Sequence, residues 1–181
     1  MEGTVIDLGG KKINRRGEFR PIEAPGTQWI YVNISTASRP DVQADIQHAP
    51  FRDASADCII CCEVLEHVPS PEQCVVEMLR ILKPGGKLIM SLPFLYPIHG
   101  DPGDYNRFTP HRIKKLCGGF QQVTIEPMGG YWGTMGMLLE IGARSMRGFF
   151  LAPFLRRSLR LLGRVLVYMD LRSVTSRPGL G

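Results

Sequence analysis

The residues most able to carry out acid–base chemistry gather in one short segment, IHGDPGDYNRF, among three turn-forming residues. A histidine side chain titrates near neutral pH, so His99 is suited to take a proton from an attacking hydroxyl group. A carboxylate at Asp101 or Asp104 would orient the imidazole. Tyr105 and Arg107 are suited to bind a sugar ring or an anionic group. The alternative is a polar surface loop in which aspartate and arginine pair. The catalytic candidates are His99, Asp101, Asp104 and Tyr105.

A second candidate site is the turn that ends TVIDLGG. An apolar run of this length predicts a strand, and glycine after it lets the backbone approach a ligand without a Cβ clash. Asp7 precedes the turn, with the alternative that it only caps its own loop. The basic residues Lys11 and Lys12 follow Gly9 and Gly10, where an apolar-striped helix is usual. We interpret them as part of an irregular loop whose side chains point outward.

Three further pairs of residues follow predicted strands. They are Asn33–Ile34 after QWIYV, Asp45–Ile46 after a short strand, and Cys62–Glu63 at the end of DCIICC. Ligands of open parallel sheets bind beyond the carboxyl ends of the strands. These pairs therefore join the candidate site. The alternatives are an ordinary turn for Asn33 and a loop aspartate that prepares the next turn for Asp45.

The elements that must position these residues alternate along the chain. Strands are predicted at 4–8, 28–35, 57–62, 87–94 and 120–127, with helices at 71–82 and 109–116. DCIICC lacks alternation, which indicates burial on both faces, with Cys58 and Cys61 on opposite sides. Strands separated by helices or long crossovers predict an α/β fold, a Rossmann-like doubly wound, mostly parallel sheet flanked by helices. We expect residues 1–134 to form this domain and residues 135–181 a helical, basic and hydrophobic extension.

The order of these segments resembles class I S-adenosylmethionine-dependent methyltransferases of the small-molecule branch. The resemblance runs from about Val5 to Phe120 and is carried by VIDLGG, ADIQHAPFRDASADCIICCEVLEHV and LRILKPGGKLIMSLPF. It implies S-adenosyl-L-methionine as cofactor and methyl transfer to an oxygen, or a nitrogen, of a small-molecule or glycan acceptor. PFLYPIHGDPGDYNRFTP further resembles members associated with polysaccharide and cell-surface glycan loci.

The resemblance also implies roles for the first two strand ends. Gly9 and Gly10 would approach the methionine part of the cofactor, and Asp7 would accept hydrogen bonds from its ammonium group or orient the turn. Asn33, with Ile34, stands where relatives carry an acidic residue for the ribose hydroxyls. An amide oxygen is a weaker acceptor than a carboxylate, so this position departs from the family.

At the next two strand ends the resemblance implies adenine contacts. The Asp45 carboxylate would take the adenine amino group, and the backbone amide of Ile46 would meet the ring. The backbone around Cys62 and Glu63 would border the cofactor, and His67 is interpreted as structural. A rival hypothesis follows from Asn33 and the atypical first loop: a degenerate methyltransferase fold that serves as a binding or assembly module. An NAD-dependent enzyme is disfavoured, since GxGxxG and an acidic residue after the second strand are missing.

Composition limits the classes of protein. The chain has 181 residues, a net charge of +5 and 44% hydrophobic residues, as in one soluble domain. Five cysteines without a second Cys/His cluster predict no metal site, and reduced thiols favour the cytoplasm. The chain shows no signal-like pattern at its start and no apolar stretch of about 20 residues, so we expect neither a signal peptide nor a membrane span.

The last part of the chain is basic. Residues 140–181 hold eight arginines but only Glu140 and Asp170 as acidic residues. If residues 155–169 form a helix, its arginines lie on one side and its leucines on the opposite side. This pattern is typical of a helix at an anionic membrane surface. The alternative is that the apolar arc packs on the domain or in a homodimer. Nucleic acid is disfavoured, because aromatic residues do not interleave with the basic ones. The sequence thus predicts a cytoplasmic protein and leaves two alternatives for the last helix: a peripheral contact at the inner face of the membrane, or packing on the domain or in a homodimer.

Overall fold

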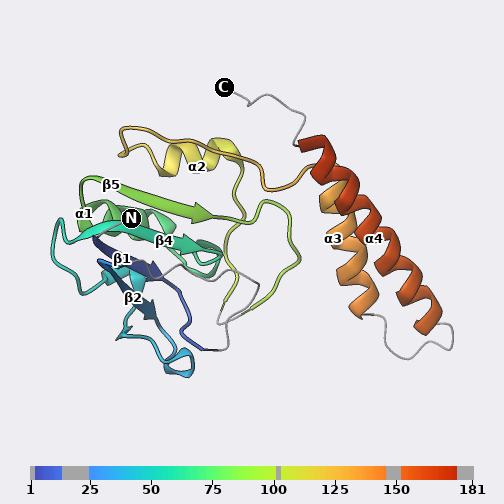
Figure 1. Ribbon diagram of the computed structural model, residues 1–181, viewed down its shortest axis with the longest axis horizontal. Helices are drawn as coiled ribbons and strands as arrows, with labels where there is room; N and C mark the ends of the chain where they lie inside the picture. The colour runs from blue at the N-terminus through green and yellow to red at the C-terminus, as the bar shows by residue number, and fades with distance from the viewer. Residues whose placement is uncertain (1–2, 14–24, 101–102, 146–151, 175–181) are drawn as a thin grey trace. The chain divides into compact units, whose positions relative to one another are not determined.

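The computed structural model describes residues 3–13, 25–100, 103–145 and 152–174. The chain divides into two compact units, Met1–Val123 and Thr124–Gly181 (Figure 1). The boundary expected after residue 134 lies inside helix α3 (Tyr131–Ser145). The division therefore comes before this helix, in the segment that leads to it.

The first unit is built on a parallel sheet of five strands. The strands are β1 (Gly3–Leu8), β2 (Thr27–Asn33), β3 (Val42–Gln43), β4 (Ala56–Cys62) and β5 (Leu82–Ser91). Their spatial order is β3-β2-β1-β4-β5, and every neighbouring pair is parallel. All carboxyl ends consequently lie at one edge of the sheet (Figure 1). This confirms the Rossmann-like α/β class.

The sheet separates two apolar clusters. Alternate residues of a strand face opposite sides, so Ile59 and Cys61 of β4 join the larger cluster while Cys58 and Ile60 join the smaller one. All four side chains are buried. The prediction that DCIICC is covered on both faces, with Cys58 and Cys61 on opposite sides, is confirmed.

Helices α1 (Pro71–Ile81) and α2 (Pro110–Leu116) cover the face of the larger cluster. Met78 and Ile81 of α1 are fully buried there. Proline opens each helix, where its missing N–H leaves no hydrogen bond unmade. Thr109 caps α2, because its hydroxyl accepts from the backbone N–H of Arg112 across 3.2 Å. Both helices agree with the sequence prediction.

One predicted strand is wrong. Residues 120–127 are described and belong to no strand, and Val123 is 37% exposed. The apolar residues alternate as in a strand, but alternation alone supplies no pairing partner. Since the segment leaves the first unit after Val123, it does not continue along the edge of β5.

The second unit is a helical hairpin of α3 and α4 (Ala152–Val174). The helices approach most closely at two glycines: a Cβ atom on Gly136 would lie 2.5 Å from the carbonyl oxygen of Gly163. The buried Asp170 carboxylate accepts from the backbone N–H of Gly130. None of the helices in the described ranges is long and apolar enough to cross a bilayer.

Candidate functional site

The turn after β1 lies against the loop that follows β4. Gly9 has φ of 83°, and a Cβ atom there would lie 2.3 Å from Cγ2 of Val64. A Cβ on Gly10 would lie 2.3 Å from the Asp7 carboxylate. Position 9 therefore needs glycine, whereas a side chain at Gly10 would displace the Asp7 carboxylate. The turn leaves backbone rather than side chains at the carboxyl edge of the sheet.

Asn33 holds this turn in place. Its side-chain nitrogen donates to the carbonyl oxygens of Gly9 (2.9 Å) and Gly10 (3.2 Å), and its oxygen accepts from the backbone N–H of Ser35 across 2.9 Å. The amide is buried, whereas the next residue, Ile34, is 57% exposed. The structure thus gives Asn33 a role in the first turn, and the remaining lone pair of its oxygen is all it can offer to a ribose.

Asp45 begins a short 3₁₀ turn, Ile46–His48. Its carboxylate is exposed and accepts from the backbone N–H of Gln47 across 2.9 Å. The side chain of Ile46 is buried in the larger cluster. The carboxylate of Asp45 is therefore among the groups that face outward at the end of β3, together with the exposed side chains of Gln43 and His48.

Glu63 follows β4 in a conformation that is rare for a residue with a side chain. Its φ is 52°, its N–H donates to the carbonyl oxygen of Ser91 (3.0 Å), and its carboxylate accepts from the Ser91 hydroxyl (2.8 Å). These contacts tie the ends of β4 and β5 together. Strained residues of this kind cluster at functional sites. Burial raises the pKa of the neighbouring Cys62 thiol, which disfavours a reactive thiolate.

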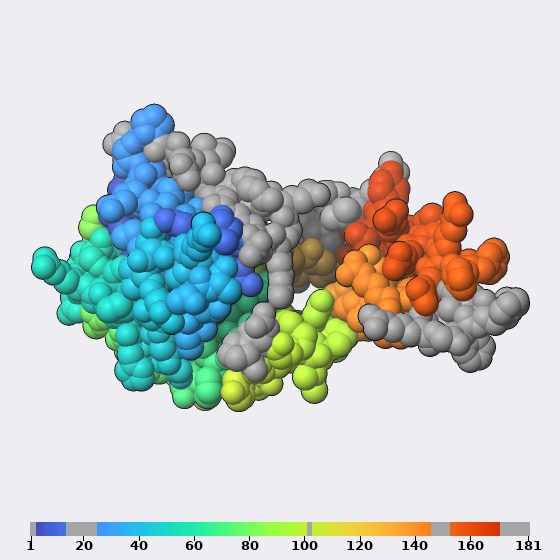
Figure 2. Space-filling model, turned by 90° about the horizontal axis from the view of Figure 1, so that it is seen from below, coloured from blue at the N-terminus to red at the C-terminus, as the bar shows by residue number. Residues whose placement is uncertain are grey.

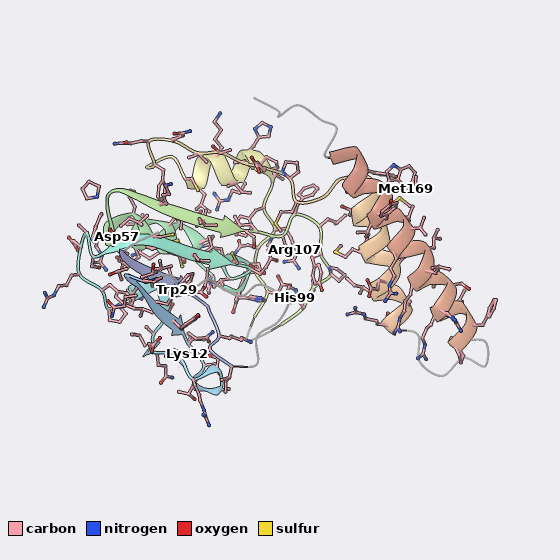
Figure 3. All side chains as sticks on the ribbon, viewed as in Figure 1. Lys12, Trp29, Asp57, His99, Arg107 and Met169 are labelled. Carbon is pink, nitrogen blue, oxygen red and sulfur yellow. The ribbon has the colours of Figure 1, made fainter. Side chains whose placement is uncertain are left out.

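Beyond β5 the chain folds His99 onto Asp104. Figure 3 labels His99 and Arg107 of this loop. Asp104 accepts from the backbone N–H of His99 at 2.8 Å, and the imidazole Nδ1 lies 3.2 Å from the same carboxylate oxygen. Arg107 donates to both oxygens of Asp104, and this pair holds the pKa of Asp104 well below its usual range. Asp104 is thus a permanent anion that orients His99.

The same loop lines a shallow pocket of about 260 Å³. Tyr105 is 60% exposed at its wall, and the N–H of Tyr105 donates to the carbonyl oxygen of Glu66 across 2.7 Å. Asp101 lies outside the described residues. The lining residues are Tyr96, Ile98, Asp104, Tyr105, Asn106 and Arg107.

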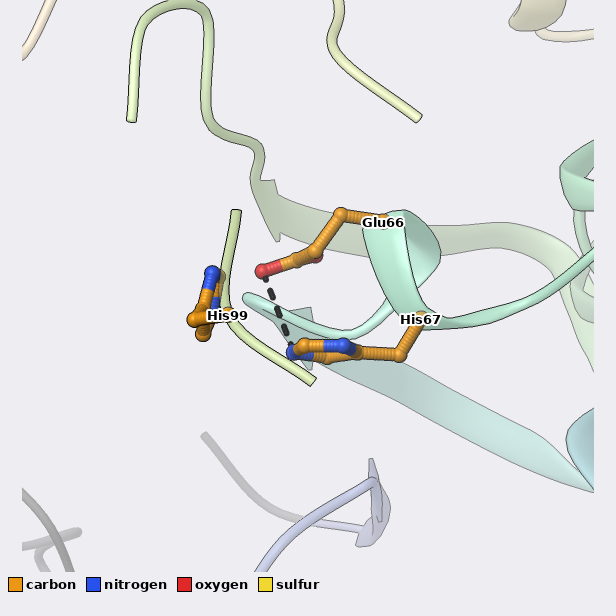
Figure 4. A group of neighbouring side chains, drawn as sticks. All are labelled: Glu66, His67 and His99. Carbon is orange, nitrogen blue, oxygen red and sulfur yellow. Dashed lines mark ion pairs between the residues drawn. The ribbon is translucent and has the colours of Figure 1, made fainter. Parts of the chain in front are cut away.

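The structure adds two residues that sequence reasoning left out of the candidate site, Glu66 and His67. Both belong to the 3₁₀ turn Leu65–His67 and lie beside His99 (Figure 4). The Glu66 side chain is fully buried, and burial raises the pKa of its carboxyl group. The adjacent Glu–His in EVLEHV was the only signal in the sequence, because His99 approaches from 32 positions further along the chain.

The basic first loop takes part in local packing. Lys12 forms an ion pair with Asp41 and lies 5.9 Å from the ring centroid of Tyr31. The side chain of Lys12 is 40% exposed, which agrees with the expectation that it points outward, and Asp41 is the acidic group that it contacts. Arg15 and Arg16 lie outside the described residues.

The sequence of residues 24–90 matches the model of a methyltransferase domain family. The ubiquinone/menaquinone biosynthesis C-methyltransferase UbiE of Haemophilus ducreyi is 35% identical over 78 residues, 43% of this chain and 30% of that protein. A methyltransferase of Mycobacterium sp. strain KMS is 33% identical over 95 residues, 49% of this chain and 38% of that protein. The chain thus spans less than two fifths of the length of these curated relatives.

Solved structures share the fold at low identity. Phosphoethanolamine N-methyltransferase 2 of Haemonchus contortus, solved with phosphomonomethylethanolamine and S-adenosylhomocysteine, has a TM-score of 0.55 at 16% identity, covering 92% of this chain and 45% of that one. The PH0226 protein of Pyrococcus horikoshii has a TM-score of 0.50 at 18% identity, covering 72% and 79%. The family match over residues 24–90 makes the chain similar to methyltransferase domains, and the five-stranded parallel sheet shares the fold of these solved structures.

Proposed function

We propose that this chain transfers a methyl group from S-adenosylmethionine to an oxygen, or less readily a nitrogen, of a small-molecule or glycan acceptor. The observation that carries the proposal is the backbone cradle at Gly9. A Cβ there would meet Val64, so glycine lets the backbone of the turn pack closely against the loop after β4, at the edge where ligands bind in open parallel sheets.

The residues around the cradle fit the cofactor. Backbone groups of the Gly9–Gly10 turn would receive its methionine part. The exposed side chain of Ile34 would cover one face of the adenine, and the exposed carboxylate of Asp45 would accept from the adenine amino group. S-adenosylmethionine supplies a methyl group activated by a sulfonium.

The acceptor side would be formed by the loop after β5. Methyl transfer needs the acceptor atom about 3–3.5 Å from the methyl carbon and in line with the bond that breaks. The pocket beside Tyr105 offers aromatic surface for a ring, and Asp104 fixes the direction of the His99 imidazole. These groups would select and orient the acceptor.

Calorimetric titration with S-adenosylhomocysteine tests the proposal. We expect Asp45→Ala to weaken binding about tenfold or more, since a hydrogen bond to a charged group contributes about 1.5–3 kcal/mol. Asp45→Ala also removes the cap of the 3₁₀ turn, so Asp45→Ser is the matched variant: serine keeps a capping oxygen but is too short to replace the carboxylate. Equal loss in both variants supports the adenine contact. A chain that binds no S-adenosylhomocysteine would instead be the degenerate binding module.

We further propose that the α3–α4 hairpin holds the enzyme at an anionic membrane surface, where a lipid-linked acceptor would be met. The support is the pattern of exposure along α4: Gly163 and Asp170 face α3, while Leu155, Leu162 and Met169 are 41%, 48% and 48% exposed. Arg157, Arg160 and Arg164 are also exposed and would face lipid phosphates. The surface of α3 and α4 is coloured orange to red in Figure 2.

A further inference from the structure

Three potential metal ligands meet where the sequence predicted no metal site. Each of Glu66, His67 and His99 offers one ligand atom, and these atoms lie within 4.8 Å of one another (Figure 4). The imidazole rings of His67 and His99 form a T-shaped, edge-to-face contact, and their centroids lie 4.9 Å apart. Glu66 and His67 come from the turn after β4 and His99 from the loop after β5, so the fold brings them together.

The carboxylate of Glu66 gives the second, independent observation. It is fully buried, and within the described residues neither of its oxygens accepts a hydrogen bond. Nε2 of His67 lies 3.7 Å from Oε1 of Glu66, beyond hydrogen-bonding distance. A buried carboxylate without hydrogen-bond partners destabilises a fold. The site around Glu66 therefore favours a bound cation, which would supply the missing positive charge.

The two imidazoles are already oriented as ligands. Nδ1 of His67 contacts the carbonyl oxygen of Gly103, and Nδ1 of His99 contacts the Asp104 carboxylate. Metal-binding histidines almost always give their second ring nitrogen to such a carbonyl or carboxylate, which fixes the tautomer. In both residues this leaves the lone pair of Nε2 for a cation.

We propose that Glu66, His67 and His99 bind one divalent transition-metal cation on the acceptor side of the methyltransferase site. Two imidazoles and one carboxylate are a ligand set for Zn²⁺, Fe²⁺ or Mn²⁺ that leaves coordination positions open. Ligands at about 2.1 Å from one ion lie about 3–4 Å apart, so binding draws the two rings inward.

This inference rests on the proposed function and gives the site a means to activate the acceptor. An acceptor hydroxyl bound to the cation has a lowered pKa and gives its proton to water. Its oxygen then bonds to the methyl carbon while the carbon–sulfur bond breaks and sulfur keeps the electron pair. The Nε2 lone pair of His99 binds the cation and is then not available to take the proton of the acceptor hydroxyl. His99 therefore acts as a metal ligand and not as the base.

Titration of the chelator-treated full chain with Co²⁺ tests the site, because the absorption of Co²⁺ reports its ligands. We expect one equivalent to bind without a thiolate charge-transfer band. His99→Gln and Glu66→Gln should each weaken binding at least tenfold. The matched control is His111→Gln, an exposed histidine of α2 that should bind like the parent chain. A thiolate band, or equal affinity in all variants, would overturn the proposal.

Thermal unfolding separates a ligand role of Glu66 from a structural one. Glutamine removes the buried charge, so Glu66→Gln should raise the Tm of the metal-free chain and abolish the rise in Tm that Co²⁺ causes in the parent. A lower Tm for the metal-free variant would mean that Glu66 only supports the fold. Titration with S-adenosylhomocysteine in chelator tests the methyltransferase proposal separately, and we expect His99→Gln to keep that affinity.

Discussion

The side chain of Asn33 donates a hydrogen bond to the carbonyl oxygen of Gly9 across 2.9 Å, joining the end of β2 to the turn after β1. The same nitrogen reaches the carbonyl oxygen of Gly10. The position for which the resemblance implies a ribose contact therefore serves here to stabilise the turn after β1.

Asn33→Asp should destabilise the chain, although it introduces the acidic residue that the resemblance would lead us to expect at this position. A carboxylate would face two carbonyl oxygens with no donor, at a cost of about 1–3 kcal/mol in the free energy of unfolding. Urea denaturation measures this cost. Gln28→Glu makes the same change of charge at an exposed position of β2 and should cost much less. Equal costs for the two variants would show that the contact to Gly9 is unimportant.

Gly9→Ala should reduce both stability and affinity for S-adenosylhomocysteine. An alanine at positive φ costs about 1–2 kcal/mol, and the clash with Val64 adds about 1–3 kcal/mol. Gly85→Ala is the matched control, because Gly85 has φ of 78° but nothing within 4 Å of its Cβ position. It should show the backbone cost alone. If both variants unfold at the same urea concentration, the close contact with Val64 contributes nothing.

Gly136→Ala should weaken the α3–α4 hairpin. The added methyl group would lie 2.5 Å from the carbonyl oxygen of Gly163, and overpacking of this kind costs about 1–3 kcal/mol. Gly142→Ala lies on the same helix with nothing within 4 Å and should instead stabilise it, by up to about 1 kcal/mol. Helix content followed during thermal unfolding distinguishes them. A rise in Tm for both variants would contradict the close glycine contact.

Glu77 should stabilise the chain in a pH-dependent way. Arg80 donates to the Glu77 carboxylate across 2.8 Å and lowers its pKa. The stabilisation is therefore fully present above the unfolded-state pKa of about 4.3 and is lost as pH falls through the lower folded-state value. Glu77→Gln should lower Tm at pH 7 and approach the parent near pH 3. A difference in Tm that stays constant with pH would exclude this pair as its source.

Leu162→Glu should reduce co-flotation with anionic vesicles about tenfold or more, because burying a leucine contributes about 1.5–3 kcal/mol. Val76→Glu is the matched control, since Val76 is 58% exposed on α1 of the other unit. Binding of the parent chain should weaken in high salt, which screens the arginines. If Leu162→Glu leaves flotation unchanged and instead converts a dimer to a monomer, the exposed face serves a second copy of the chain.

The sequence by itself determined the parallel sheet, both helices of the first unit and the basic helix of the second, because hydrophobic periodicity, proline and glycine act locally. It also placed the candidate residues at one edge, since the carboxyl ends of parallel strands share an edge. It failed at residues 120–127, where alternation predicted a strand that has no partner.

Only the tertiary structure decided what the polar residues at that edge contact. Asn33 turns toward Gly9, and His99 returns to Glu66 and His67 from a separate loop. The α3–α4 contact likewise depends on two glycines 27 positions apart in the chain. Such pairs are fixed by strand register and by the paths of loops, which bring distant residues together without leaving a local pattern in the sequence.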